Sequence, residues 1–343
     1  MTGLQGILIL SMVLAYTMYM GFNDGSLAIS TTIVTRATKP KTALLIAAIT
    51  KFIVPIGAFY IGTNIVAEKL SVQMFIGALP SGEMGFAFLF AGLLGAMIWA
   101  IVSYFLKLPI SISHTLLGGI IGAGSVCIGF FSVNWTGYVL LNVVAMVFLA
   151  PLVALILGFF LLKLIKKISS KAPGRRAGNV LIWMQRINFI ILSGSFASNN
   201  WQKSLGILLM ASAMGIMNFS GGVSVWIVIS IAGAMMLGML VGGTNIILTT
   251  GKKLFKVEPI HSVAAQLTAS IIAELSNMTG IALGVGQAMT ASIIGAGAAD
   301  RVNAVQWKKA RNILIGWTLT LPISGMIGAL IYVITSAIMG IPF

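Results

Sequence analysis

Long apolar runs, separated by short polar or basic stretches, make up most of this chain of 343 residues. A membrane-spanning helix needs about 20 predominantly apolar residues. The runs are continuously apolar, whereas the strands of a membrane β-barrel alternate apolar and polar positions. The pattern therefore predicts membrane helices over 3–21, 41–66, 85–106, 110–131, 135–163, 181–197, 204–219, 223–249, 260–281, 283–298 and 312–338.

Composition supports the same class of protein. Hydrophobic residues make up 58% of the chain and charged residues only 8%, whereas soluble domains carry about 25% charged residues. So few polar side chains cannot cover a water-facing surface, which predicts an all-α polytopic membrane protein. The single cysteine, Cys127, excludes a disulfide framework and a cysteine-based metal site. The first span follows Met1 without a basic region, so we expect it to be retained rather than cleaved.

The net charge of +15 reflects membrane topology rather than nucleic-acid binding. Basic residues are scattered between apolar runs, with one dense group in "KLIKKISSKAPGRR" at 163–176. Cytoplasmic loops of membrane proteins carry an excess of Lys and Arg. Placing the basic loops inside predicts a cell-membrane protein with both termini outside and the 164–180 linker cytoplasmic. This arrangement requires that 204–219 is not a full crossing.

Four landmarks recur in the same order in the two halves of the chain. They are "GFND" at 21–24 and "ASNN" at 197–200, "GTNI" at 62–65 and 243–246, "PISISHTLLGGIIGAG" at 109–124 and "ALGVGQAMTASIIGAG" at 282–297, and the segments ending at Pro151 and Pro322. An odd number of crossings per half would turn the second copy upside down. The sequence thus predicts two inverted-topology repeats of about five helices each, plus short discontinuous segments, over 1–163 and 181–343. Inverted repeats are typical of secondary transporters, whose site lies near the membrane midplane.

Only two of the six acidic residues, Asp24 and Glu274, are expected at membrane depth. An ionisable group there is costly and points to a functional site. Asp24 is followed by Gly25 and Ser26, which predicts a helix break that exposes backbone groups. The alternative is a helix cap at the membrane surface. Glu274 is either a proton carrier or a hydrogen-bonding residue between helices.

Two further stretches carry candidate chemistry. "LPISISHT" places Pro109 before Ser111, Ser113 and His114, and hydroxyls with free N–H groups at a helix start suit an oxyanion. Alternatively, the hydroxyls bond to their own helix. "ASNNWQKS" adds side-chain amides and the cation of Lys203. The sequence contains no Walker, zinc or nucleophile-elbow motif, so we do not expect an enzyme.

These stretches resemble the inorganic phosphate transporter family, called PiT. That family has a Gly-Ala-Asn-Asp type motif near the start of each half and a Pro-Val-Ser-Thr-Thr-His type motif later in each half. Here the first copies are "GFND" and "PISISH". "SFASNNWQKSLGI" resembles the second Asn-Asp motif, and "GAGAADRVNAVQW" resembles the end of the second motif region. The resemblance spans nearly the whole chain.

The resemblance implies a phosphate and cation site, carried over residue by residue. In the first half it implies Asn23, Asp24, Ser111, Ser113 and His114, and in the second half Asn199, Asn200, Gln202 and Lys203. Two departures stand out, because Asn200 replaces the family's second Asp and Gln287 stands at the second His position. Thr290 and Ser292 are the nearest surviving hydroxyls of that second motif.

We therefore predict a symporter that imports an inorganic oxyanion, first of all phosphate, together with Na⁺ or H⁺. Asp24, with Na⁺ near it, and Glu274 are the candidates for the coupling ion, and no other cofactor is expected. The loss of one Asp favours sulfate, which carries no proton and needs only donors, so a sulfate permease of the same family is the alternative. A passive anion channel or a non-transporting sensor belongs to a different class, and a homo-oligomer stays open.

Overall fold

The structure, a computed structural model, describes residues 2–106, 110–170, 174–219, 221–242, 247, 254–281 and 283–341. Pro109, the "GTNI" copy at 243–246 and the middle of the linker at 171–173 lie outside these residues. The described chain is helical apart from connecting segments and one isolated β-bridge between Phe75 and Val133. This confirms the predicted all-helical class.

The described part of the first half contains four helices of 22 residues or more, one of 16 residues and three shorter helical segments. The elements are α1 (Thr2–Val34), α2 (Pro40–Ile61), α3 (Ile65–Val72), α4 (Gly82–Phe105), α5 (Ile112–Cys127), η1 (Phe130–Ser132), the π-helix η2 (Trp135–Val144) and α6 (Ala145–Ser169). The described part of the second half also combines long helices with shorter ones. Its described elements are α7 (Gly174–Ala213), α8 (Val225–Val241), α10 (Pro259–Thr279), α11 (Val285–Asp300), η4 (Val302–Ala304) and α12 (Trp307–Met339).

In the described part of the chain, six helical segments are long and apolar enough to cross a membrane. They contain α1, α2, α4, η2 with α6, α7 and α12. By contrast, α5 and α11 have 16 residues each. At 1.5 Å per residue, such a helix covers about 24 Å, less than the ~30 Å hydrocarbon core. These two short, largely buried helices therefore do not span as 110–131 and 283–298 were expected to.

Two expectations about helix continuity are wrong. The chain does not break at Asp24, because α1 runs without interruption from Thr2 to Val34. Nor are 181–197 and 204–219 separate spans, because α7 is one helix of 40 residues. Hydroxyls that were expected to favour a break instead bond within the helix, as Ser26 Oγ donates to Phe22 O at 2.6 Å.

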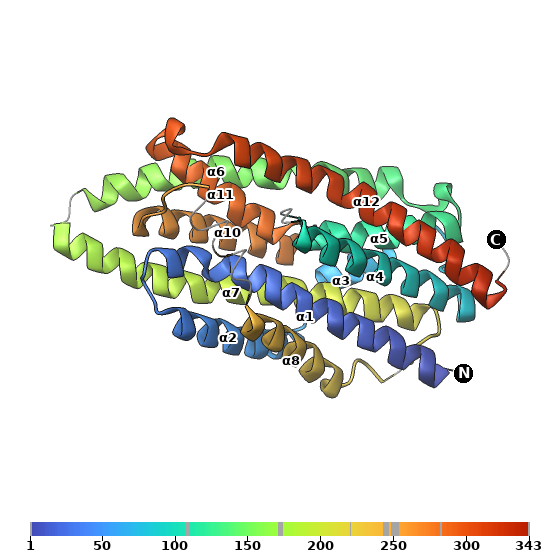
Figure 1. Cartoon of the computed structure of the whole chain (residues 1–343). Coiled ribbons are helices and arrows are strands. Elements are labelled where there is room, and N and C mark those ends of the chain that lie inside the picture. Colours follow the sequence, from blue (N-terminus) through green and yellow to red (C-terminus); the bar gives the residue numbers. More distant parts are fainter. Residues whose placement is uncertain are drawn as a thin grey trace.

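The two halves run in opposite directions (Figure 1). α1 begins at the end of the molecule that also holds the C-terminus, whereas α7 begins at the other end, and α6 and α12 are likewise opposed. Each short helix also packs against a long helix of the other half. α5 packs against α4 and α12, and α11 packs against α10 and α6.

Close glycine contacts hold the two short helices in place. Gly122 and Gly295 occupy the same position in the repeated sequence "IIGAG". A Cβ on Gly122 would overlap the carbonyl of Gly325 in α12, and a Cβ on Gly295 would overlap the carbonyl of Leu155 in α6. Each short helix therefore packs backbone to backbone against a long helix of the other half, as small residues allow in membranes.

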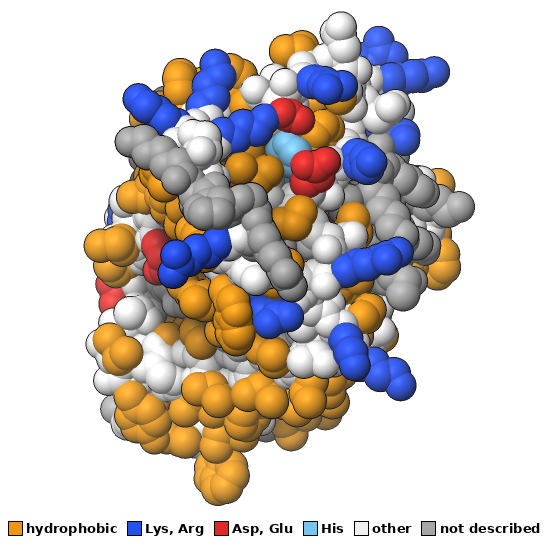
Figure 2. Space-filling model, turned by 90° about the vertical axis from the view of Figure 1, so that its left-hand side faces the viewer, with side chains coloured by type: hydrophobic (Ala, Val, Ile, Leu, Met, Phe, Trp, Pro, Cys, Tyr) orange, Lys and Arg blue, Asp and Glu red, His pale blue; other side chains and the backbone are white. Residues whose placement is uncertain are grey.

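The ends of the molecule differ in charge. Both termini lie at one end (Figure 1), and Lys and Arg gather on the face at the opposite end (Figure 2). The expected linker at 164–180 is largely helical in its described part, since α6 continues to Ser169 and α7 begins at Gly174.

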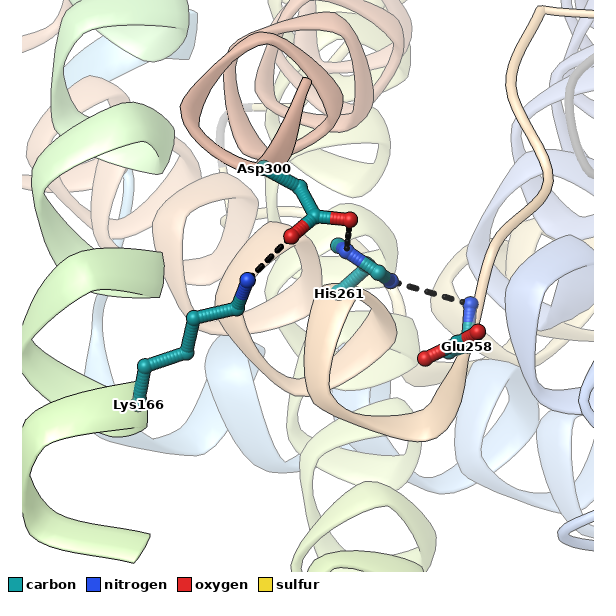
Figure 3. A network of polar contacts seen from close by, with 4 residues as sticks. All are labelled: Lys166, Glu258, His261 and Asp300. Atoms are coloured by element: carbon teal, nitrogen blue, oxygen red, sulfur yellow. Dashed lines mark hydrogen bonds and ion pairs between the residues drawn. The ribbon is translucent and has the colours of Figure 1, made fainter. Parts of the chain in front are cut away.

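A polar network joins three helices at the basic end (Figure 3). Lys166 of α6 pairs with Asp300 of α11, whose other carboxylate oxygen lies 3.4 Å from Nε2 of His261 in α10. His261 Nδ1 in turn accepts a hydrogen bond from the backbone N–H of Glu258 at 3.1 Å. The hydrogen bond from Lys166 lowers the pKa of Asp300 below its ordinary value.

Candidate functional site

The first turns of α5 and α11 meet in the middle of the molecule. Ser111 is the N-cap of α5 and Gly284 is the N-cap of α11. A Cβ on Gly284 would lie 2.7 Å from Ser111 Oγ, so the two helix starts are in contact. Because the N-terminus of a helix carries partial positive charge and free N–H groups, this junction favours an anion.

Three polar side chains of α5 lie at this junction, and all are buried. Ser111 Oγ lies 2.8 Å from His114 Nδ1, which fixes the histidine ring. Ser113 Oγ accepts a 2.6 Å hydrogen bond from the ammonium group of Lys203. His114 Nε2 is buried and has no hydrogen-bond partner among the described residues.

Asp24 of α1 is held between two side-chain amides. Asn23 Nδ2 donates to Asp24 Oδ1 at 3.0 Å, and Asn200 Nδ2 of α7 donates to Asp24 Oδ2 at 2.9 Å. Asn200 Oδ1 accepts from Lys203 Nζ at 3.4 Å. A carboxylate and an ammonium group are thus linked through one amide.

The second short helix also reaches this carboxylate. A Cβ on Gly286, in the first turn of α11, would lie 3.4 Å from Asp24 Oδ1. The polar chain Asp24–Asn200–Lys203–Ser113 therefore connects α1, α7 and α5 beside the starts of both short helices. We call this set, with Asn23, Ser111 and His114, the central cluster.

Two of the predicted residues on α7 point elsewhere. Asn199 Nδ2 donates to Ser276 Oγ at 2.9 Å and to Asn277 Oδ1 at 3.0 Å, both on α10. Gln202 Oε1 accepts from the backbone N–H of Val66 at the start of α3, at 2.9 Å. On an unbroken helix, residues three apart share a face, so Asn200 and Lys203 form one pair and Asn199 and Gln202 another.

Glu274 joins the second of these groups. It is exposed on α10, and its Oε2 accepts from Asn277 Nδ2 at 3.3 Å. Since Asn277 also binds Asn199, the three residues form an oxygen-rich cluster between α7 and α10. In the structure, Asn199 Oδ1 is buried and has no hydrogen-bond partner among the residues that can be placed.

The two predicted hydroxyls of α11 bond to backbone carbonyls. Thr290 Oγ1 donates to Gly286 O at 2.9 Å. Ser292 Oγ lies 3.0 Å from Ala265 O and 2.8 Å from Met289 O. Both therefore have helix-internal or interhelical partners in the structure.

The sequence analysis did not place two buried residues in the site. Gln287 of α11 lies against the N-cap Gly284, and neither of its side-chain polar atoms has a partner in the described part of the chain. Lys51 of α2 is fully buried. Its signal in the sequence was a lone cation within the expected span 41–66, and it was missed because Lys51 belongs to none of the motifs that the sequence analysis singled out.

A bound cation would need oxygen ligands at this site. The described residues contain no group of three or more His, Cys, Asp or Glu side chains. Na⁺ is a hard cation, so its ligands would be the carboxylate of Asp24 or Glu274 together with amide and backbone oxygens.

The fold and this buried polar centre define a multi-pass helical membrane transporter. Residues 20–328 match the model of the phosphate transporter family. The chain belongs to that family.

Individual relatives match this chain over most of its length. The chain is 31% identical over 334 residues to a protein of Bacillus subtilis described as a probable low-affinity inorganic phosphate transporter, covering 97% of both chains. It is also 31% identical over 313 residues to a Rhizobium meliloti protein of the same description, covering 91% of both. A solved structure described as "The sodium-dependent phosphate transporter" has the same fold, with a TM-score of 0.78 at 17% identity, covering 97% of this chain and 99% of that one.

Proposed function

We propose that this protein is a secondary active symporter that imports inorganic phosphate and binds it at the central cluster. The observation that carries the proposal is the buried ammonium group of Lys203, which is aimed at Ser113 in the first turn of α5. An ammonium, hydroxyls and helix N-termini together supply the donors and the positive potential that an oxyanion needs.

Asp24 favours phosphate over sulfate. Near neutral pH phosphate keeps at least one proton, and a carboxylate accepts a hydrogen bond from that proton, whereas sulfate has none to donate. Asn200 supplies a hydrogen-bond donor where a second carboxylate would supply an acceptor. Because sulfate needs only donors, a sulfate permease is the second candidate function. The relatives' descriptions name inorganic phosphate.

The coupling ion is proposed to act at Asp24, with Glu274 as the second candidate. A cation near Asp24 would lower the cost of holding an anion in the same buried region. The structural neighbour is described as sodium-dependent, which supports Na⁺ near Asp24 as one candidate beside H⁺.

Both termini are proposed to lie outside and the 164–180 linker in the cytoplasm of a cell membrane. The proposal follows from the concentration of Lys and Arg at the end opposite the termini (Figure 2). The opposed directions and exchanged packing partners of the two halves support inverted repeats over 1–163 and 181–343.

Uptake into proteoliposomes tests the function. Labelled phosphate and labelled sulfate are offered separately under imposed Na⁺ or H⁺ gradients, and we expect phosphate to accumulate against its own gradient. Preferred accumulation of sulfate would establish the alternative substrate. A downhill flux that does not saturate would instead establish an anion channel.

A Ser113→Ala variant tests the site itself. Losing a hydrogen bond to a charged group costs about 1.5–3 kcal/mol, or roughly a tenfold or greater loss of phosphate affinity. Ser125→Ala is the matched control, because Ser125 lies on the same helix and its hydroxyl donates to Ile121 O. Wild-type affinity in a correctly inserted Ser113→Ala protein would refute the site.

A further inference from the structure

Lys51 and Lys203 are both fully buried, but their surroundings differ. Lys203 Nζ donates to Ser113 Oγ at 2.6 Å and to Asn200 Oδ1 at 3.4 Å. Lys51 Nζ has no hydrogen-bond partner anywhere in the described part of the chain. The side chain of Lys51 is 0% exposed, so neither water nor lipid headgroups reach it in this state.

Lys51 lies next to the central cluster. Its Cε is 3.0 Å from the position that a Cβ on Gly25 would occupy, and Gly25 follows Asp24 directly in α1. The side chain of Met239, from α8, lies against the same glycine. Gly25 therefore lets the amine-bearing end of Lys51 approach α1 at the level of the proposed anion site.

Among the described residues, the helices that pack against α2 carry few charged groups. α2 packs against α1, α7 and α8. α1 contributes Asp24, whose charge acts on both Lys51 and Lys203. α7 contributes Lys203 and, near its start, Arg176 and Arg186, while α8 has no ionisable residue over Val225–Val241.

Because Lys51 lacks a hydrogen-bond partner among the described residues and lies beside Asp24, its protonation depends on whether an anion occupies the central cluster. An ammonium group without a partner in a buried membrane environment is costly. A buried lysine can avoid that cost by losing its proton, as lysines do far more readily than arginines. An anion that enters beside Asp24 adds negative charge and reverses this preference, whereas Lys203 already has two acceptors in this structure.

We propose that Lys51 carries the proton that accompanies the anion. This inference rests on the proposed function, names the coupling ion as H⁺ and places the proton on Lys51, beside Asp24 rather than on its carboxylate. A proton from the side of entry binds the lone pair of the Lys51 amine as phosphate arrives, and it leaves to the other side after phosphate is released. With both amines protonated, two positive charges balance Asp24 and a monoanionic phosphate, so the loaded site is neutral.

Binding and proton uptake are then linked, and each favours the other to the same extent. Proton uptake is measured on purified protein in weak buffer with a pH dye, as phosphate is added. We expect Lys51→Met and Lys51→Arg to take up about one proton fewer per bound phosphate than the wild type. Phosphate's own titration is common to all variants and cancels in this comparison.

Two variants serve as controls for charge and folding. Lys41→Met removes a cation from the exposed start of the same helix and should leave the proton count unchanged. Lys51→Arg keeps a cation that cannot release its proton, so it separates proton carriage from a merely fixed charge. Lys51→Gln replaces Lys51→Met if the latter is not monodisperse after purification.

Accumulation in proteoliposomes without Na⁺ gives the second measurement. We expect the wild type to accumulate phosphate under an inward H⁺ gradient and both Lys51→Met and Lys51→Arg to lose this accumulation. The proposal is overturned if Lys51→Arg retains it, or if the wild type exchanges phosphate yet accumulates it only with Na⁺. Those results would leave the phosphate function intact, whereas a wild type that neither exchanges nor accumulates phosphate would refute both.

Discussion

At the scale of single residues, Asp24 is a carboxylate with both oxygens occupied by amide donors. Asn23 and Asn200 supply these donors from α1 and α7. Hydrogen bonds to a carboxylate stabilise its charged form, and Asp24 is buried. The structure therefore does not support a helix cap, which would require Asp24 to lie at a helix end.

Asp24→Asn is expected to abolish coupled phosphate accumulation. The new amide keeps the size of the side chain but loses its charge, and its NH₂ group would face one of the two existing donors. Relieving that clash by turning Asn200 would break the contact of Asn200 Oδ1 with Lys203. Accumulation under each cation gradient, measured beside wild type at matched membrane expression, checks this.

Sulfate uptake adds a substrate-specific control. Asp24→Asn should impair phosphate more than sulfate, because sulfate has no proton to donate. Asn200→Asp, which places two carboxylates together, should strengthen the dependence on a cation. Unchanged cation dependence and anion preference in Asp24→Asn would assign Asp24 a purely structural role.

At the scale of elements, two short helices depend on glycine contacts with helices of the other half. Gly122→Ala and Gly295→Ala each place a Cβ on a backbone carbonyl that cannot move aside like a side chain. Overpacking of this kind typically costs about 1–3 kcal/mol. We expect both variants to unfold at lower temperature in detergent and to lose phosphate binding, because the helix starts shift.

Gly57→Ala is the matched control within α2. A Cβ at this position meets nothing within 4 Å, and alanine is a better helix former than glycine by up to about 1 kcal/mol. Unchanged or raised thermal stability is expected for Gly57→Ala. If Gly122→Ala behaved like this control, the backbone packing of α5 on α12 would not position the site.

The charged network at the basic end makes a pH-dependent contribution to stability. The pKa of Asp300 is lowered by Lys166, so this contribution is complete above the ordinary carboxyl pKa near 4 and is lost as pH falls through the lower folded value. Asp300→Asn should therefore lower the unfolding temperature at pH 7, and the difference from wild type should shrink in strong acid. The partly exposed pair contributes less than about 1 kcal/mol.

Lys163→Met provides the control for this network. Lys163 lies on α6 close to Lys166, but its ammonium sits over the ring of Phe159 at 4.3 Å from the centroid. The Lys163→Met protein should unfold with the same pH dependence in acid as the wild type. An Asp300→Asn protein that matches wild type at pH 7 would mean that the network does not tie α6, α10 and α11 together.

At the scale of the whole molecule, charge asymmetry sets the expected orientation. Arg176 is exposed near the basic start of α7, and Glu83 is exposed near the start of α4. We expect a cysteine at Arg176 to resist an impermeant thiol reagent in intact cells and to react once the membrane is opened. The native Cys127 is buried and gives a low background.

Glu83→Cys is the control from the opposite end and should react in intact cells. Glu83 lies at the end of the molecule away from Arg176. Its neighbour Gly82 donates a backbone hydrogen bond to Met214, which directly follows the C-terminal end of α7, whereas Arg176 lies near the start of that helix. Reaction of Arg176→Cys from outside would reverse the proposed orientation and place the termini in the cytoplasm.

The sequence by itself determined the class of protein and many of the polar residues that are candidates for the site. Composition and apolar run length require a membrane-embedded helical chain regardless of packing, and the repeated "IIGAG" marks two related segments, one in each half. Asp24, Ser113 and Lys203 stand out because polar groups are costly at membrane depth. These properties are local, so a linear pattern reveals them.

Only the tertiary structure decided which polar residues meet. Because α7 is continuous and each residue turns the helix by about 100°, Asn200 and Lys203 face the central cluster while Asn199 and Gln202 face α10 and α3. The sequence pattern suggested breaks at these amides, since it cannot show that neighbouring helices satisfy them. The burial of Lys51 without a hydrogen-bond partner among the described residues likewise depends on how α1, α7 and α8 pack against α2, which no local pattern records.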